Sequence, residues 1–172
     1  MKVFLKEIWM NINKIVYRKA TEHDVPFMTG ILVDAAAESG VHISADELPV
    51  HPDTYQYIEK FPEGLDIGII AETTEGLPVG AAWIRMLPDN AHTINQPMPE
   101  LTMGVTSEYR RMGLGERLLE ELYNAASEMN ITEISLGVHK ENLPAISLYK
   151  KQGWIKDGSF KEYIMMSRKT SI

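Results

Sequence analysis

The stretch that most constrains the fold is ELTMGVTSEYRRMGLGERLLEEL, residues 100–122, in which a short apolar run precedes two glycines and a leucine-rich segment. The run ELTMGV predicts a strand, residues 114–129 have helical spacing, and ITEISLGV predicts a second strand. A strand–helix–strand crossover of this kind makes its two strands parallel and places the N-terminus of the helix at the carboxyl end of the first strand. The sequence therefore predicts an α/β domain with a parallel strand pair.

Gly113 and Gly115 lie at the mouth of the predicted helix. A helix N-terminus offers unpaired N–H groups to an anion, and glycine lets a phosphate approach the backbone closely. An ordinary turn whose donors bind water is the alternative. Glu116 replaces the lysine of a P-loop, and Leu118 occupies the position of the third glycine of a dinucleotide fingerprint, so neither motif is present.

The remaining chain alternates between predicted strands and helices. We expect strands at 14–21, 65–73, 75–87 and 159–168, with a hairpin joining the second and third. Helices are expected after Thr21, which can act as a cap, and at 54–61 and 143–152. Loops are expected at 39–53 and 88–99. In the extension 1–14, apolar residues at 4, 5, 8, 9 and 12 favour an amphipathic helix.

Composition narrows the class of protein. A chain of 172 residues with 44% hydrophobic residues predicts a single domain, 1–172. The formal charge is −7 and no basic run is present, which argues against nucleic acid as a partner. Cysteine is absent, and the five histidines lack ligand spacing, so we expect neither a cysteine nucleophile nor a metal. No apolar run approaches the ~18 residues that span a bilayer, so we expect a cytoplasmic protein without membrane contact.

Two motifs resemble the GNAT superfamily of acetyl-CoA-dependent N-acetyltransferases. Arg110, Gly113 and Gly115 match its Arg/Gln-x-x-Gly-x-Gly/Ala signature. A second motif is matched downstream by Asn142, Ala145, Leu148, Tyr149, Gly153 and Trp154. The resemblance implies a mixed, mostly antiparallel sheet of about six to seven strands flanked by helices, with the parallel pair splayed at the cofactor site.

The resemblance also implies an activity. It is transfer of an acetyl group from acetyl-CoA to a primary amine of a small molecule or peptide, by direct attack in a ternary complex. A non-catalytic CoA-binding regulatory module with the same fold is the alternative. Relatives are often dimers, so a homodimer is compatible with the resemblance.

Cofactor-binding residues follow from the motif positions. The resemblance implies that the strand around Met103 and Val105 binds the pantetheine arm, that Asn142 and Tyr149 lie along it, and that Arg110 and the turn bind the pyrophosphate. The turn residues are Arg111, Met112, Gly113, Leu114, Gly115 and Glu116. Asn142 is equally suited to cap the helix that follows it. Glu116 would repel a pyrophosphate, so we expect its side chain to point to solvent.

Tyr149 and Glu100 are the candidate catalytic residues. By resemblance Tyr149 protonates the departing CoA thiolate; packing against Ala145 and Trp154 is the alternative. An alkylamine with a pKa near 10.4 lies about 3.4 units above pH 7, so deprotonating the acceptor is the larger task. Glu100 is the candidate base, directly or through water, although a surface or turn role is at least as compatible with its position. His51 and His92 are weaker candidates in loops.

The acceptor is not determined by the sequence. By analogy with relatives, the loops 39–53 and 88–99 line its pocket. Asp46, Glu47 and Asp53 would suit a polyamine, whereas Arg85, on the strand that also carries Trp83, would favour a carboxylate. These two indications point in opposite directions.

Overall fold

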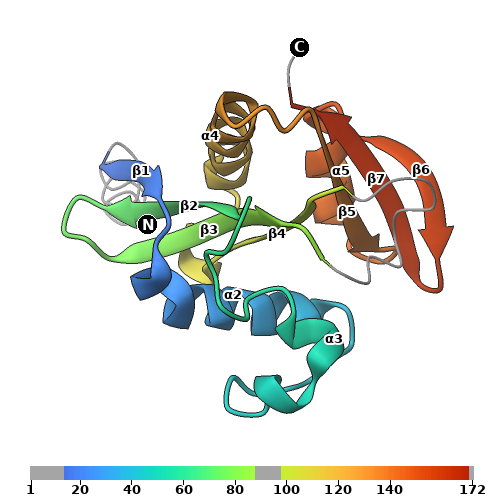
Figure 1. The fold of residues 1–172 in the computed structure, drawn as a ribbon, viewed down its shortest axis with the longest axis horizontal. Coiled ribbons are helices and arrows are strands. Elements are labelled where there is room, and N and C mark those ends of the chain that lie inside the picture. Colours follow the sequence, from blue (N-terminus) through green and yellow to red (C-terminus); the bar gives the residue numbers. More distant parts are fainter. Residues whose placement is uncertain (1–13, 88–97, 171–172) are drawn as a thin grey trace, which may run out of the picture.

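The sheet of this protein has seven strands, with helices on both faces (Figure 1). The computed structural model describes residues 14–87 and 98–170. The strands are β1 Ile15–Lys19, β2 Ile67–Thr73, β3 Pro78–Arg85, β4 Glu100–Val105, β5 Glu133–His139, β6 Ile155–Phe160 and β7 Tyr163–Lys169. The helices are α2 Val25–Glu38, α3 Pro52–Tyr55, α4 Leu114–Glu128 and α5 Leu143–Lys151, with single 3-10 turns η1 Glu22–Asp24, η2 Leu48–Val50 and η3 Ser107–Tyr109. Nearly all of the extension 1–14, in which an amphipathic helix is expected, and most of the loop 88–99 lie outside the described residues.

The strand order is β1-β2-β3-β4-β5-β7-β6, and only β4 and β5 run parallel. The mixed, mostly antiparallel sheet predicted from the sequence is therefore confirmed. Residues of β3 alternate between two cores: Ala82 and Ile84 pack with α4, whereas Ala81 and Trp83 pack with α2. This alternation places α4 and α2 on opposite faces, as Figure 1 shows.

The final strand predicted at 159–168 is wrong as a single element. Residues 155–160 and 163–169 form two antiparallel strands, β6 and β7, joined by a tight turn. Lys161 takes a left-handed φ of 51° at this turn. Neither turn residue, Lys161 or Glu162, is a glycine, proline or asparagine, so the usual signal for a hairpin is missing.

The helix predicted at 54–61 is also wrong. Helix α3 ends at Tyr55, and the chain continues in tight turns. Two buried side chains on β3 donate hydrogen bonds to carbonyl groups of this segment. The indole of Trp83 donates to the carbonyl of Tyr57 at 2.8 Å, and Nη1 of Arg85 donates to that of Glu59 at 2.8 Å. Tertiary hydrogen bonds thus replace helical ones, which local sequence does not reveal.

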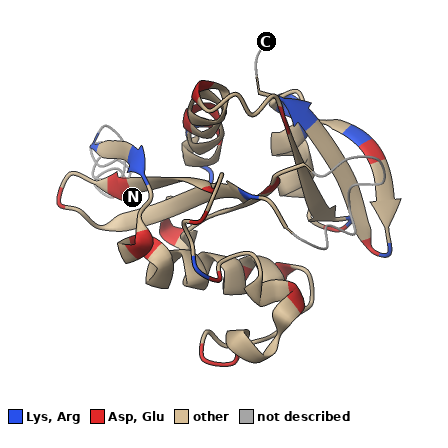
Figure 2. Ribbon diagram, in the orientation of Figure 1, with Lys and Arg blue, Asp and Glu red and all other residues tan. Residues whose placement is uncertain are grey.

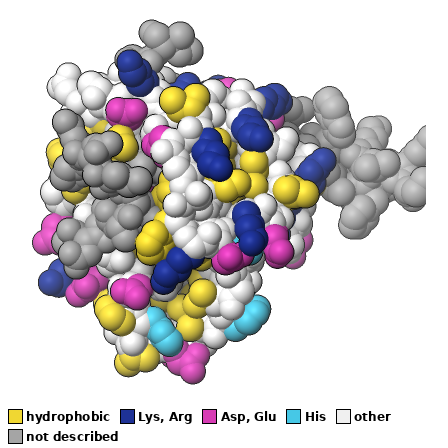
Figure 3. All heavy atoms as spheres, turned by 90° about the vertical axis from the view of Figure 1, so that its right-hand side faces the viewer, with side chains coloured by type: hydrophobic (Ala, Val, Ile, Leu, Met, Phe, Trp, Pro, Cys, Tyr) yellow, Lys and Arg dark blue, Asp and Glu magenta, His cyan; other side chains and the backbone are white. Residues whose placement is uncertain are grey.

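Charges of both signs are interspersed over the described elements (Figure 2). On the face in Figure 3, Lys and Arg side chains lie among acidic and apolar ones instead of forming a continuous basic surface. Among the described residues, no helix is long and apolar enough to cross a membrane.

Candidate active site

The two parallel strands separate almost as soon as they meet. Their register contains one pair, Glu100 with Ser135, beside which the Ser135 amide donates to the carbonyl of Pro99 at 2.9 Å. Beyond this apex the strands border a cleft of about 1390 Å³, which is also lined by the end of α2 and the starts of α4 and α5. The splayed pair expected from the sequence therefore opens a large cavity at the carboxyl ends of the strands.

The glycine turn lies at one side of this cleft. Gly113 has a left-handed φ of 83° and precedes the first residue of α4. No described group accepts a hydrogen bond from the amides of Leu114, Gly115 or Glu116. Three free N–H groups at a helix N-terminus suit an anion, because the helix dipole adds positive potential there. The turn therefore has the donor set that a pyrophosphate requires.

Most of the predicted cofactor-binding residues line the cleft. Those that do are Met103, Val105, Arg110, Arg111, Gly113, Leu114, Gly115, Glu116, Asn142 and Tyr149. Met112 is not among the lining residues and packs against the core under α4. A single residue of the turn is thus turned away, since the left-handed Arg111 and Gly113 on either side of it redirect the chain.

Ion pairs hold the charged side chains around the turn. Glu116 does not point freely to solvent as expected: its Oε1 pairs with Nζ of Lys151 on α5 at 2.7 Å. Arg110 pairs through Nη1 with Oε1 of Glu38 at 3.1 Å. Lysine at the end of α5 thus neutralises the acid beside the free amides.

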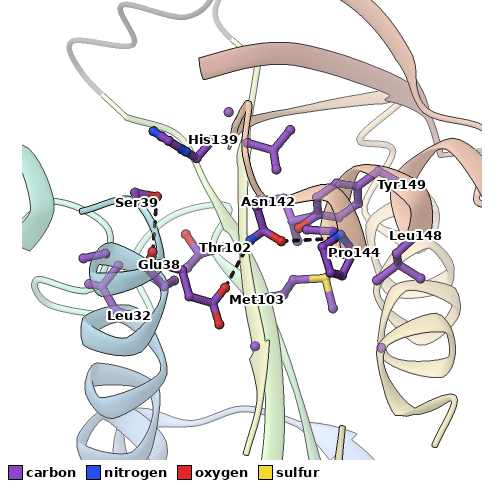
Figure 4. Close-up of a pocket in the computed structure, with 18 of the residues that line it drawn as sticks. Leu32, Glu38, Ser39, Thr102, Met103, His139, Asn142, Pro144, Leu148 and Tyr149 are labelled. Carbon is purple, nitrogen blue, oxygen red and sulfur yellow. Dashed lines mark hydrogen bonds between the residues drawn. The ribbon is translucent and has the colours of Figure 1, made fainter. Parts of the chain in front are cut away.

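Asn142 has two roles in the structure. Its Oδ1 accepts from the Ala145 amide at 3.2 Å and caps α5, as the alternative reading proposed. Its Nδ2 donates to Oε2 of Glu38 at 3.1 Å, so a carboxylate from α2 reaches across the cleft (Figure 4). Glu38 therefore links both motifs, through Arg110 and through Asn142.

Tyr149 projects from α5 into the cleft and is held by aromatic packing. Its ring centroid lies 5.7 Å from that of Trp154, whose Nε1 donates to the hydroxyl of Tyr123 at 2.7 Å. Among the described residues, no group hydrogen-bonds the Tyr149 hydroxyl. Burial raises the pKa of Tyr149 above its ordinary value, so the hydroxyl keeps its proton at neutral pH.

Glu100 lies at the apex of the cleft and is 3% exposed, so the surface role considered for it is wrong. Its Oε1 accepts a hydrogen bond from the hydroxyl of Tyr57 at 2.7 Å, and its buried Oε2 has no partner among the described residues. Burial raises the pKa of Glu100 to about 7, although the Tyr57 hydrogen bond opposes the rise. A carboxyl group with this pKa can accept and release a proton at neutral pH.

The residues suggested for acceptor binding separate into two groups. Asp53 lines the cleft, whereas Asp46 and Glu47 do not. Trp83 is fully buried in the core that includes α2 and does not line the cleft. Arg85 is not available to a substrate carboxylate, because its Nη2 pairs with Oδ2 of Asp66 at 3.0 Å.

Comparison with known proteins agrees with this geometry. A model described as the acetyltransferase (GNAT) family matches residues 31–154. The chain belongs to the GNAT acetyltransferase family. It is therefore an acyltransferase, and the resemblance stated from the two motifs is confirmed.

Two GNAT relatives have curated names. The N-alpha-acetyltransferase of Sulfurisphaera tokodaii is 42% identical over 55 residues, which are 31% of this chain and 33% of that protein. The L-amino acid N-acetyltransferase AaaT of Escherichia coli is 24% identical over 157 residues, 90% of this chain and 91% of AaaT. The first match thus spans a third of the relative, and the second nearly all of it.

Solved structures share the fold. A GNAT-family acetyltransferase from Staphylococcus aureus Mu50 aligns with a TM-score of 0.68 and 19% identity, over 91% of this chain and 99% of that chain. The PaiA N-acetyltransferase of Thermoplasma acidophilum, solved in complex with coenzyme A, aligns with a TM-score of 0.68 and 16% identity, over 90% and 98%. Each alignment thus covers at least 90% of this chain.

Two residues of this GNAT site were not identified from the sequence. Tyr57 lies in the segment mispredicted as helix, and Glu38 is the last residue of α2. No local signal marks Tyr57, because its contact with Glu100 joins segments 43 residues apart. Glu38 has a weak local signal: an acid at the C-terminus of a helix interacts unfavourably with the helix dipole, which indicates that it has a partner elsewhere.

Proposed function

We propose that this protein transfers an acetyl group from acetyl-CoA to a primary amine of a small molecule or peptide, by direct attack in a ternary complex. The main observation in support is that one cleft holds both the free amides of 114–116 and the buried carboxyl group of Glu100, one oxygen of which has no partner among the described residues. The amides fit a pyrophosphate, and the carboxyl group fits an amine that must lose a proton.

Each residue has a defined task in this proposal. Backbone groups of β4 at Met103 and Val105, together with Asn142, hold the pantetheine arm, and the turn holds the pyrophosphate. Acetyl-CoA supplies the thioester, whose carbon–sulfur bond breaks as the carbon–nitrogen bond forms. Glu100 takes the proton of the acceptor ammonium at its free Oε2, directly or through one water. Tyr149 gives its hydroxyl proton to the departing sulfur. The second proton that the nitrogen loses as the amide forms restores the Tyr149 hydroxyl through water in the cleft, and Glu100 releases its proton to solvent before the next turnover.

The raised pKa of Glu100 supports its role. An ordinary glutamate with a pKa near 4.3 is a weak base for an ammonium group with a pKa near 10. A value of about 7 narrows this gap by more than 2 units while leaving a substantial fraction ionised at neutral pH. Burial at the apex thus supports a role for Glu100 in proton removal.

The test combines binding and turnover. Thermal unfolding is followed with CoA, acetyl-CoA, ATP and NAD; a ligand at a hundred times its Kd adds about 2.7 kcal/mol of stability. Thiol release is then measured over a panel of L-amino acids, peptides with a free N-terminus, and polyamines, because the named relatives are an L-amino acid N-acetyltransferase and an N-alpha-acetyltransferase. No shift with CoA compounds would overturn the proposal. A shift without thiol release from any amine would favour the non-catalytic CoA-binding module.

A further inference from the structure

Arg85 and Glu100 occupy directly opposite positions in the antiparallel β3–β4 ladder. Opposite residues of such a ladder project from the same face, with Cβ atoms about 4.5–5.5 Å apart. Both residues are buried, with exposed fractions of 7% and 3%. A guanidinium group and a carboxyl group in these positions are close enough to form a buried ion pair.

They do not form one. The Arg85 guanidinium is directed instead to Asp66, at 3.0 Å, and to the carbonyl of Glu59, at 2.8 Å. Within the described part of the chain, Nε of Arg85 and Oε2 of Glu100 are the buried side-chain polar atoms without a hydrogen-bond partner. Two groups of opposite charge thus face each other across the ladder, each with an unsatisfied atom.

Asp66 is well placed to maintain this separation. Its side chain is 4% exposed, and its Oδ2 also accepts from the Glu63 amide at 3.0 Å. A buried carboxylate fixed by a backbone donor cannot follow Arg85 if the guanidinium swings toward β4. Burial raises the pKa of Asp66, and its bonds to Glu63 and Arg85 oppose the rise.

We propose that Asp66 is a positioning residue, which holds Arg85 away from Glu100 and so leaves Oε2 of Glu100 free to take the proton of the acceptor amine. This inference rests on the proposed role of Glu100 as the base. An arginine paired with that carboxylate would stabilise its ionised form and make it a poorer proton acceptor. Asp66 therefore acts on the reaction without lining the cleft.

Other groups around Glu100 do not replace Arg85. Among the described residues, the titratable or charged side chains that face Glu100 or its hydrogen-bond partner Tyr57 are Arg85 on β3, Tyr57 itself and Asp53 on the segment 52–57, and Tyr163 on β7. On β5 the register partner is the uncharged Ser135. Tyr57 donates to Oε1, while Asp53 and Tyr163 influence Tyr57 electrostatically. Arg85 is thus the one cation among them that a change at Asp66 would release.

The test is Asp66→Asn, which keeps the size of the side chain but removes its charge. We expect the released Arg85 to pair with Glu100 and the acidic limb of the kcat–pH profile to move down by about one pH unit or more. The carboxyl ¹³C resonance of Glu100, assigned with Glu100→Gln, is expected to titrate at the same lower pH. In Asp66→Asn/Arg85→Gln no guanidinium remains, so the titration is expected to return to the wild-type position.

Two further variants keep the test decisive. Glu63→Gln removes an exposed acid from the same turn and is expected to leave the Glu100 titration unchanged. Arg85→Gln is expected to leave it near the wild-type pH, because Arg85 does not pair with Glu100. The proposal is overturned if Glu100 titrates at the wild-type pH in folded Asp66→Asn. It is also overturned if Glu100 titrates at a higher pH in Arg85→Gln than in wild type. If Asp66→Asn does not fold, the Arg85→Gln result decides alone. Wild-type turnover in Glu100→Gln would instead refute the base, while the ¹³C titration still reports on Asp66.

Discussion

Tyr57 donates its phenolic hydrogen to Oε1 of Glu100 over 2.7 Å, although the two residues are 43 positions apart in the chain. Tyr57 comes from the segment after α3, and Glu100 begins β4 at the apex of the cleft. The indole of Trp83 fixes the Tyr57 backbone by donating to its carbonyl. The orientation of the proposed base thus depends on a fully buried tryptophan that does not line the cleft.

Tyr57→Phe is expected to move the acidic limb of the kcat–pH profile upward. The Tyr57 hydrogen bond lowers the pKa of Glu100, so its loss raises that pKa further above about 7. Hydrogen bonds to charged groups contribute about 1.5–3 kcal/mol, which corresponds to a shift of about one to two pH units. We expect turnover to fall several-fold at pH 6.5 and to recover by pH 9.

Tyr55→Phe is the matched control for this prediction. Tyr55 lies two residues earlier, packs against the core under α2 and does not line the cleft. The kcat–pH profile of Tyr55→Phe should follow that of the wild type. An unmoved limb in Tyr57→Phe would mean that the hydrogen bond does not influence the base.

The site was predictable where its residues are close in sequence. Gly113 and Gly115, and likewise Asn142 and Tyr149, were identified through two short motifs that resemble the GNAT family, each confined to one turn or one helix, and the structure brings these residues to the same cleft. Helices α4 and α5 also begin at the predicted residues. Short-range patterns carry this information because capping and amphipathic spacing act within a few residues.

Contacts across the sheet were not predictable. Arg85 looked like a candidate for binding a substrate carboxylate, yet its partner is Asp66 from a different element. The indole of Trp83, which lies outside the segment predicted as a helix, donates to the carbonyl of Tyr57 within it. Such pairings depend on which strands become neighbours, and no periodicity in a single segment encodes that.

Glu100→Gln is expected to become more stable than wild type as pH rises. The pKa of Glu100 rises from 4.5 to about 7 on folding, so between these values the folded state binds more protons than the unfolded state. The stabilising contribution of protonated Glu100 in the wild type is therefore fully present below about pH 4.5 and is lost as pH rises to about 7. Above pH 7 the stability difference between the two proteins is constant. The shift corresponds to about 3 kcal/mol. Urea unfolding at pH 4.5, 6 and 7.5 measures the difference between the two proteins.

Asp24→Asn provides the opposite case. The hydrogen bond from Arg18 is the largest cause that lowers the pKa of Asp24, so both folded and unfolded states are ionised above pH 5. Its stability difference from wild type should stay constant over the range in which that of Glu100→Gln changes. A constant difference for Glu100→Gln as well would show that Glu100 is not held with a raised pKa.

Tyr149→Phe is expected to lower kcat ten-fold or more while the Kd for acetyl-CoA changes little. The ring still packs against Trp154, so the loss is confined to the hydroxyl that supplies the proton. Because burial raises the pKa of Tyr149, turnover of the wild type should show no alkaline limb from this group below pH 10. Thiol release and equilibrium binding measure the two parameters, and unaltered turnover would remove Tyr149 from the reaction.

Glu38→Ala is expected to tighten acetyl-CoA binding about three- to ten-fold. The carboxylate of Glu38 accepts a hydrogen bond from Nδ2 of Asn142 and forms an ion pair with Nη1 of Arg110. Both of these residues are proposed to contact the cofactor. Removing the carboxylate frees both donors and takes a negative charge away from a site for an anion. Exposed ion pairs contribute only about 0.2–1 kcal/mol, so stability should change little. Isothermal titration with acetyl-CoA measures the affinity.

Asp34→Ala controls for the loss of an acid from the same helix. Asp34 lies one turn before Glu38, is exposed, and has no hydrogen bond or ion pair among the described residues. Its variant should bind acetyl-CoA within about two-fold of wild type, because a solvent-exposed charge is largely screened. Weaker binding in Glu38→Ala would reverse the interpretation: the carboxylate would then position Asn142 and Arg110 for the cofactor, and its bridge across the cleft would persist in the complex.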